Sequence, residues 1–281
     1  MTVSIGYING KYVELDELAI PIEERGHQFG DGVYEVIRYY DGKGFMLEEH
    51  LERLKESTEA IRINLEGGIE PIRSIIEEGV KKAGIPDCYV YLQITRGIAE
   101  RNHLFPGSEV KPSISMTVKK MVPRKKEAEE GVGVITHPDE RWANCYIKSL
   151  NLLPNILAKQ TAADAGCFEA ILIKDNYVTE GTQSTMFIVE GVTVVTPPLS
   201  KQILPGITRI AVLDICKIAG IKLEEREISK EELFNADEVF LTSTMSEVMP
   251  ITSIDNQKVG TGEPGNITKV LMELFVAKRS K

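Results

Sequence analysis

A charged stretch that contains one proline separates two parts of this chain with different apolar patterns. Residues 119–131 read Lys-Lys-Met-Val-Pro-Arg-Lys-Lys-Glu-Ala-Glu-Glu-Gly, and no apolar period crosses them. Such a composition is typical of a connection between domains. Because 281 residues exceed the usual size of one core, we predict two domains, 1–118 and 131–281, joined by a linker at 119–130. The alternative is a solvated loop inside one domain.

The first part of the chain combines strand and helix patterns. Apolar and polar residues alternate in segment 5–13 on both sides of Asn9-Gly10, a dipeptide that favours a tight hairpin turn. Apolar residues recur at helical spacing in two segments and alternate as in strands in two others. The helical segments are 46–63 and 69–83, and the strand-like ones are 88–95 and 113–118. A small α+β domain is therefore expected.

The second part is richer in short strand patterns. Helices are expected at 152–165, 207–219 and 266–278. Strands are expected at 132–135, 170–173, 177–179, 185–189, 192–195 and 239–242. We therefore predict a strand-rich domain with helices packed on it, and an α+β class for the whole chain.

Composition excludes several functional classes. A net charge of −9 argues against a nucleic-acid or acidic-membrane partner, because either would need a broad basic face. Without an apolar run of about 18 residues or a leader pattern at the amino terminus, a cytoplasmic location without membrane attachment is expected. The four cysteines and four histidines are dispersed, which predicts reduced thiols and no metal site.

Lys148 is the strongest catalytic candidate. It lies in Cys-Tyr-Ile-Lys-Ser-Leu-Asn-Leu-Leu (145–153), and Glu180 follows in Thr-Glu-Gly. An ε-amine attacks a carbonyl when its ammonium form is disfavoured, as partial burial can achieve. A carboxylate opposite a pyridinium nitrogen keeps such a cofactor ring an electron sink. The alternative for Lys148 is a solvated surface lysine, the commoner fate of this residue type.

Two loops and one arginine can bind a phosphate. Leu-Pro-Gly-Ile-Thr-Arg (204–209) is typical of a helix amino terminus, where N–H groups and the dipole favour an anion. A second loop, Thr-Ser-Thr-Met-Ser (242–246), follows an apolar strand and carries four hydroxyls. Arg53 can pair with a phosphate through its planar guanidinium. The alternatives are an ordinary capped helix, a plain turn and an ion pair of Arg53 with Glu49.

Residues on two further segments can contact a substrate. Arg101 and His103 lie in a loop after a predicted strand and can hold a carboxylate, although a hydrophilic surface loop is the alternative. Gly30-Asp31-Gly32 lacks the third glycine of a dinucleotide fingerprint. Its glycines more simply let the backbone bend near a ligand.

Six segments in this order resemble the fold-type IV, or class IV, pyridoxal-phosphate aminotransferases, and most closely the D-amino-acid aminotransferases among them. The resemblance runs nearly from end to end and is far more specific than any single segment. The segments are 25–35 (Arg-Gly-His-Gln-Phe-Gly-Asp-Gly-Val-Tyr-Glu), the helix with Glu49-His50 and Arg53-Leu54, Lys148-Ser149-Leu150-Asn151-Leu152-Leu153, Thr179-Glu180-Gly181, Gly206-Ile207-Thr208-Arg209 and Thr242-Ser243-Thr244.

The resemblance implies a homodimer of two-domain subunits, with a smaller N-terminal domain, a larger C-terminal domain and pyridoxal phosphate at their interface. Lys148 would form a Schiff base with the cofactor and then move the proton between substrate and cofactor. Glu180 would face the pyridine nitrogen, with Arg141 as its supporting partner. Further cofactor contacts are implied for Arg53, Leu204, Ile207, Thr208, Ser243 and Thr244.

For the substrate, the resemblance implies D-amino acids and 2-oxo acids, with D-alanine and 2-oxoglutarate as the expected pair. Tyr34 and Met245 would line the substrate side, and Arg101-Asn102-His103 matches the Arg-x-His pair that traps the α-carboxylate from the neighbouring subunit. Arg38, in contrast, resembles an arginine of the branched-chain enzymes. A branched-chain L-aminotransferase, (R)-amine activity, an aminodeoxychorismate lyase and a non-catalytic cofactor-binding protein are the alternatives.

Overall fold

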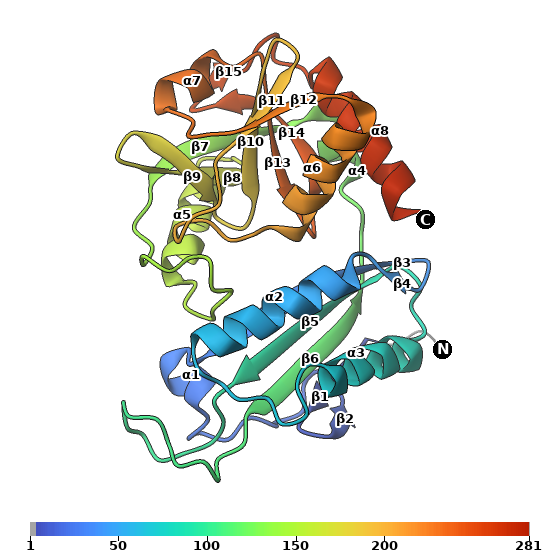
Figure 1. Cartoon of the computed structure of the whole chain (residues 1–281), viewed down its shortest axis with the longest axis vertical. Coiled ribbons are helices and arrows are strands. Elements are labelled where there is room, and N and C mark those ends of the chain that lie inside the picture. The colour runs from blue at the N-terminus through green and yellow to red at the C-terminus, as the bar shows by residue number, and fades with distance from the viewer. Residues whose placement is uncertain (1–3, 281) are drawn as a thin grey trace. The chain divides into compact units, whose positions relative to one another are not determined.

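The structure, a computed structural model, describes residues 4–280 and divides into two compact units (Figure 1). The first unit is the chain up to Val122 together with Ile147–Asn151, and the second is Pro123–Tyr146 together with the chain from Leu152 onward. The expected linker region contains the end of a strand and the short helix α4 (Lys125–Glu130). The return of residues 147–151 to the first unit was not anticipated from the sequence.

The first unit is built on a six-stranded antiparallel sheet. Its strands follow the spatial order β2-β1-β6-β5-β3-β4. The predicted hairpin is confirmed: Asn9 and Gly10 both have positive φ, 43° and 94°, as its turn requires. The strands are β1 (Ile5–Ile8), β2 (Lys11–Val13), β3 (Gly32–Tyr40), β4 (Lys43–Gly44), β5 (Cys88–Thr95) and β6 (Ser113–Lys120).

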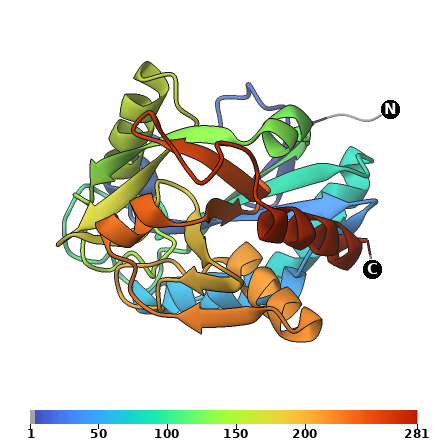
Figure 2. The same cartoon turned by 90° about the horizontal axis from the view of Figure 1, so that it is seen from above.

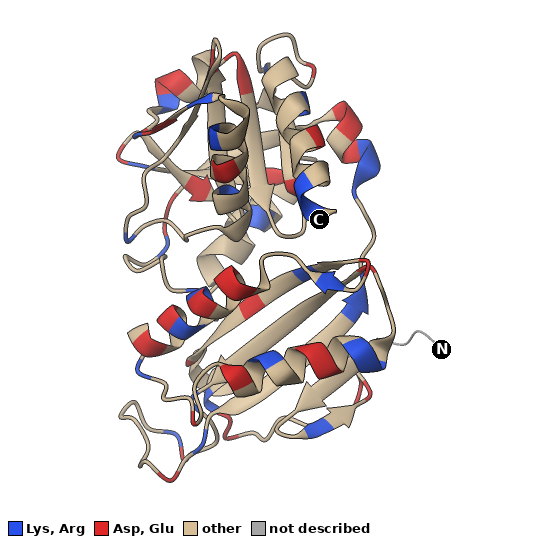
Figure 3. Cartoon of the chain, turned by 45° about the vertical axis from the view of Figure 1, so that its right-hand side comes forward, with Lys and Arg blue, Asp and Glu red and all other residues tan. Residues whose placement is uncertain are grey.

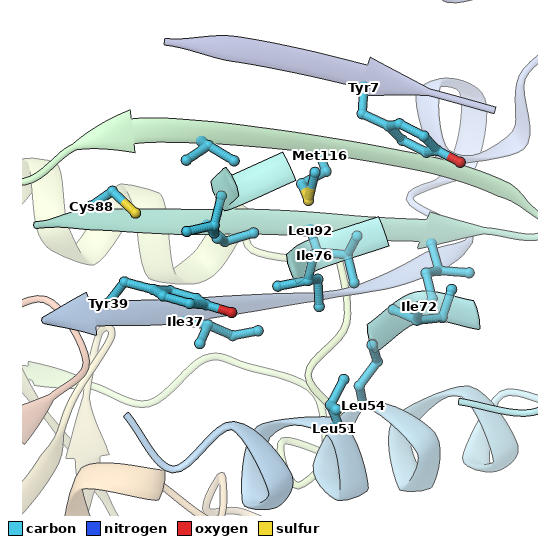
Figure 4. Close-up of a cluster of buried hydrophobic side chains, with 14 of the residues drawn as sticks. Tyr7, Ile37, Tyr39, Leu51, Leu54, Ile72, Ile76, Cys88, Leu92 and Met116 are labelled. Carbon is cyan, nitrogen blue, oxygen red and sulfur yellow. The ribbon is translucent and has the colours of Figure 1, made fainter. Parts of the chain in front are cut away.

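Helices α2 (Leu47–Ala60) and α3 (Glu70–Ala83) pack on this sheet, and a short helix, α1 (Arg25–Phe29), precedes β3. Figure 4 shows Leu51 and Leu54 of α2 pointing toward strand residues such as Ile37. Full burial of each such side chain contributes roughly 2 kcal/mol. Acidic and basic residues run along both helices in Figure 3, so their other faces are suited to water.

The second unit is built on a nine-stranded mixed sheet. The order is β12-β11-β10-β13-β14-β7-β8-β9, and β15 pairs with β14. Pairs β11/β12, β14/β7 and β7/β8 are parallel. The strands are β7 (Val132–Pro138), β8 (Glu169–Lys174), β9 (Tyr177–Gly181), β10 (Thr185–Glu190), β11 (Thr193–Thr196), β12 (Lys222–Glu225), β13 (Glu238–Ser243), β14 (Glu247–Ile254) and β15 (Gln257–Lys258).

Besides α4, four helices complete the second unit: α5 (Leu153–Asp164), α6 (Ile207–Ala219), α7 (Lys230–Asn235) and α8 (Asn266–Arg279). Helices α6 and α8 lie side by side in Figure 2 and pack together. Within the sheet core, the rings of Phe187 and Phe240 stack with their centroids 4.7 Å apart. The α+β class predicted from the sequence is thus confirmed. No helix within residues 4–280 is long and apolar enough to cross a membrane.

Candidate functional site

Residues 147–151 run beside the start of β3 and fix the position of Lys148. The N–H of Tyr34 donates to the Lys148 carbonyl at 3.0 Å, and the N–H of Leu150 donates to the Gly32 carbonyl at 3.0 Å. The Lys148 N–H donates to the Ser57 hydroxyl of α2 at 3.2 Å. Because these bonds use the backbone, the lysine side chain is left for another role.

Gly32 allows this close approach between β5, β3 and residues 147–151. A Cβ atom at Gly32 would lie 2.5 Å from the Ile94 carbonyl oxygen and 2.8 Å from Leu150 Cδ1. The half-buried Lys148 side chain then places its Nζ 4.2 Å from the centroid of the Tyr34 ring. The first unit therefore brings together Lys148 and Tyr34, two of the candidates identified from the sequence.

Arg53 is held by a buried carboxylate and not by Glu49. Its Nε and one Nη donate to the two oxygens of Glu35 at 2.7 and 2.8 Å, and His50 Nδ1 lies 2.8 Å from the same carboxylate. Glu35 is fully buried, which alone would raise its pKa, but Arg53 and His50 hold that pKa well below its usual range. Burial conversely lowers the pKa of His50. Arg53 is also one helical turn from Ser57, the contact of Lys148.

Replacing Glu35 with glutamine should destabilise the protein, because it leaves the buried Arg53 guanidinium without its counter-charge. We expect a loss of about 3 kcal/mol in the free energy of unfolding at pH 7, measured by urea denaturation of the cofactor-free protein. Glu49→Gln, an exposed change on the same helix, is the matched control and should change it by less than about 0.5 kcal/mol. Equal losses in the two variants would contradict the assignment of Glu35 as the partner.

The same variant should show a defined pH dependence. The folded-state pKa of Glu35 lies below its usual range. The stability that ionised Glu35 gives the folded protein is therefore complete above the unfolded pKa of about 4.3. It is lost as the pH falls toward the folded-state pKa. The difference in the free energy of unfolding between wild type and Glu35→Gln should therefore narrow below about pH 4. A difference that widens there would contradict the lowered pKa of Glu35.

Arg101 and His103 lie together on the surface of the first unit. Both side chains are exposed and flank the ring of Phe29, with the Arg101 guanidinium carbon 4.9 Å from the ring centroid and the His103 ring centroid 5.5 Å away. The carbonyl of Asn102 accepts a hydrogen bond from the buried Arg25 at 2.6 Å. The loop thus presents a cation and an imidazole from an anchored backbone. Arg38 lies elsewhere, buried within β3.

In the second unit, Glu180 of β9 is a buried carboxylate with both oxygens occupied. One oxygen contacts Nη1 of Arg141, and the other accepts from the Leu204 N–H at 3.0 Å. Burial raises the pKa of Glu180 to about 7, although Arg141 and the Leu204 N–H act in the opposite direction. A cation placed against this carboxylate would be favoured strongly, because burial leaves the charge poorly solvated.

Arg141 is fixed by a second acid that the sequence reasoning missed. Asp139 accepts from Arg141 Nε at 2.8 Å and from Nη2 at 2.6 Å, and Thr179 donates to it at 2.7 Å. Burial alone would raise the pKa of Asp139, but the contacts with Arg141 lower this pKa below its usual value. The spacing Asp-x-Arg, ahead of the lysine, is a signal that could have identified this pair.

The two loops proposed for phosphate binding are neighbours. Gly206 is the N-cap of α6, and a Cβ atom there would lie 2.7 Å from the Thr185 hydroxyl. Thr185 pairs across the sheet with Thr242, whose buried hydroxyl has no hydrogen-bond partner among the described residues. The loop after Thr242 is closed by a bond from the Ser246 N–H to the Ser243 hydroxyl at 3.0 Å. N–H groups of a helix terminus and an available hydroxyl are therefore adjacent, as an anion requires.

Of the remaining candidates, Ile207 and Thr208 are buried in the first turn of α6. Thr244 and Met245 are half-buried in the loop between β13 and β14. Residues 4–280 contain no group of three or more His, Cys, Asp or Glu side chains placed to hold a metal ion.

Comparison with known proteins gives one consistent result. A sequence model of the family described as Amino-transferase class IV matches residues 32–254. The D-alanine aminotransferase of Bacillus licheniformis is 47% identical over 261 residues, which cover 93% of this chain and 92% of that protein.

Solved structures agree in fold. The branched-chain amino acid aminotransferase of Escherichia coli has a TM-score of 0.89 at 25% identity, covering 97% of this chain and 93% of that one. The T.th. branched-chain amino acid aminotransferase with pyridoxamine 5'-phosphate has a TM-score of 0.89 at 26% identity, covering 98% of this chain and 94% of that one.

Proposed function

Because the chain belongs to the class IV aminotransferase family, which depends on pyridoxal phosphate, we propose that it transfers the amino group of D-alanine to 2-oxoglutarate. The products are pyruvate and D-glutamate, in a ping-pong cycle. The observation that carries this proposal is the 47% identity, over 93% of the chain, to a D-alanine aminotransferase. The branched-chain neighbours are about half as similar in sequence, so the branched-chain alternative is not favoured.

Polar groups of the second unit suit this cofactor. The Thr242 hydroxyl, unpartnered among the described residues, and the adjacent helix terminus at Gly206 suit a phosphate, and the buried Glu180 carboxylate suits a protonated ring nitrogen. When bound, pyridoxal phosphate supplies an electron sink for negative charge at the substrate Cα. We assign the phosphate to Arg53, Ile207, Thr208, Ser243 and Thr244. Leu204 would contact the ring.

In this proposal Lys148 supplies the amine that bonds the cofactor and later carries the Cα proton. One mobile amine beside Tyr34 is sufficient to remove and return that proton on a single face. The Glu180 carboxylate would face the ring nitrogen. Arg141 positions Glu180, and Asp139 in turn positions Arg141.

We assign the substrate α-carboxylate to Tyr34 with Arg101 and His103 of the neighbouring subunit, and Met245 to the substrate side chain. A homodimer in the cytoplasm is part of the proposal. The exposed positions of Arg101 and His103 around Phe29 support a role in contacting a ligand beyond their own unit.

A spectral half-reaction separates the candidate functions. The enzyme loaded with pyridoxal phosphate is mixed with D-alanine, with L-leucine or with an (R)-primary amine, and loss of the cofactor's visible absorption is followed. We expect D-alanine to react at least about 100-fold faster than L-leucine, the discrimination that about 2.7 kcal/mol provides. Rapid conversion by L-leucine alone would overturn the proposed function in favour of the branched-chain alternative.

A further inference from the structure

Arg38 is a buried cation without an acidic partner in the part of the chain that the structure describes. The residue is 3% exposed, and its Nε and Nη1 make no hydrogen bond to any residue between 4 and 280. The titratable group beside it is Cys88, whose pKa burial raises to about 11, so that this thiol does not supply a negative charge at neutral pH. A buried guanidinium normally requires an anion and hydrogen-bond acceptors.

The neighbouring ring leaves the donors of Arg38 available. The guanidinium carbon of Arg38 lies 4.7 Å from the centroid of the Tyr40 ring. A guanidinium that stacks on an aromatic ring uses its face, whereas its N–H donors lie in its plane and point outward from the edge. That edge matches the two oxygens of a carboxylate in a bidentate pair.

Arg38 is on the strand face that also carries Tyr34. Successive side chains of β3 point to opposite faces, so positions 34, 36 and 38 share one face, while the buried Glu35 and Ile37 lie on the other. Residues 34, 36 and 38 thus form a row, and Lys148 Nζ is beside the Tyr34 ring at one end of this row. The row therefore begins at the proposed reacting amine and ends at a cation whose counter-ion is missing from the described residues.

The spacing suits a substrate with two carboxylates. The Cα atoms of residues 34 and 38 are about 13 Å apart along an extended strand. Both side chains stand roughly perpendicular to the sheet, so the length of the arginine does not shorten this span. The carbon chain of a five-carbon diacid covers about 5 Å, and a hydrogen bond at each end covers about 3 Å. Together these lengths come to about 11 Å and cover most of the distance between positions 34 and 38, whereas the methyl group of D-alanine would stop well short of Arg38.

We propose that Arg38 binds the distal carboxylate of dicarboxylic substrates, the 2-oxo diacid acceptor and the corresponding D-amino diacid. This assignment rests on the proposed function and adds to it the group that recognises the acceptor. Arg101 and His103 then bind the α-carboxylate that every substrate carries. Arg38 binds the distal carboxylate, which D-glutamate has and D-alanine lacks. The buried cation gains its counter-ion only when such a substrate is present.

The test compares two half-reactions in the enzyme loaded with pyridoxal phosphate. The second-order rate constants for D-glutamate and D-alanine are measured in wild type, Arg38→Met and Arg38→Lys. We expect the ratio of the rate constant for D-glutamate to that for D-alanine to fall about 100-fold in Arg38→Met. The fall should be smaller in Arg38→Lys, which keeps the charge but loses the planar guanidinium. Arg73→Met, which removes a half-buried arginine paired with Glu48 and Glu70, is the control and should keep the wild-type ratio of the two rate constants.

A second readout does not depend on turnover. Glutarate, which has no amino or oxo group, should raise the melting temperature of wild type and of Arg73→Met, and fail to raise that of Arg38→Met. A ratio within threefold of wild type, or a retained glutarate shift in Arg38→Met, would overturn the role of Arg38. If wild type converts neither amino acid, the proposed function fails, and the glutarate shift still decides whether Arg38 binds a dicarboxylate. Should Arg38→Met not fold, Arg38→Lys decides by the same two measurements.

Discussion

Replacing Lys148 with alanine should reduce turnover of D-alanine by about 10⁴-fold or more, because the variant loses both the amine that bonds the cofactor and the proton carrier. The fold should survive this change. The backbone bonds of Lys148 to Ser57 and Tyr34 remain, and the contact that is removed is the one with the Tyr34 ring. Steady-state kinetics with D-alanine and 2-oxoglutarate provide the measurement.

Two further variants make this prediction specific. Lys148→Arg keeps a cation at the same place but cannot give up its proton, so the loss should be as large. Lys201→Ala removes an exposed lysine of the second unit and should leave turnover within about twofold of wild type, since surface changes of this kind have small effects. A Lys148→Ala enzyme with more than a tenth of wild-type turnover would refute the catalytic assignment.

Replacing Glu180 with glutamine should lower kcat on the order of 10³-fold with little change in KM. The neutral amide cannot stabilise a protonated ring nitrogen, and the removal of one preorganised charge opposite a reacting group costs this much. Arg141 keeps its bonds to Asp139, so the surrounding loop should remain in place. The measurement is kcat and KM for D-alanine, with cofactor content determined for each preparation.

Asp139→Asn is the matched comparison for Glu180→Gln. It removes a carboxylate that touches the same guanidinium, but it leaves the Glu180 carboxylate itself. We expect a loss of about tenfold in kcat, because Asp139 acts only by positioning Arg141. Glu180→Asp, which keeps the charge at a shorter reach, should lie between the two. Equal losses for Asp139→Asn and Glu180→Gln would show that the charge on Glu180 has no separate role.

Regular apolar periods predicted most elements to within a residue or two. Segments 88–95 and 207–219 were predicted with the bounds that β5 and α6 have, because each has one strong period and clear ends. Strand β3 was not among the strands predicted from apolar periods, because Glu35 and Arg38 are charged residues in a buried strand. A sequence pattern assigns charges to solvent, whereas here both are buried, Glu35 with Arg53 as its partner.

Strand β14 was missed for a different reason. It contains Pro250, and proline cannot donate to the ladder of a sheet, which argues against a strand. The inclusion of residues 147–151 in the first unit could not be predicted either. That segment is held by backbone bonds to Gly32 and Tyr34, and backbone pairing leaves little trace in side-chain composition.

The candidate residues were found mainly through the order of six segments, and the structure adds the groups that hold them. Lys148 and Tyr34, and separately Glu180, Arg141 and Leu204, are brought into contact within their own units. Glu35, His50 and Asp139 were not anticipated as partners, because their roles depend on contacts between residues distant in sequence. Their burial and pKa values follow from packing, which no local motif contains.

Chemical trapping tests the central assignment most directly. The enzyme loaded with pyridoxal phosphate is reduced with sodium borohydride, which fixes a Schiff base as a stable bond, and its peptides are mapped by mass spectrometry. We expect the pyridoxyl mass increment on Lys148 alone, and its disappearance in Lys148→Arg. An increment on a different lysine of wild type, or an unmodified Lys148 in protein that retains the cofactor, would contradict the assignment of Lys148 as the cofactor-bonding amine.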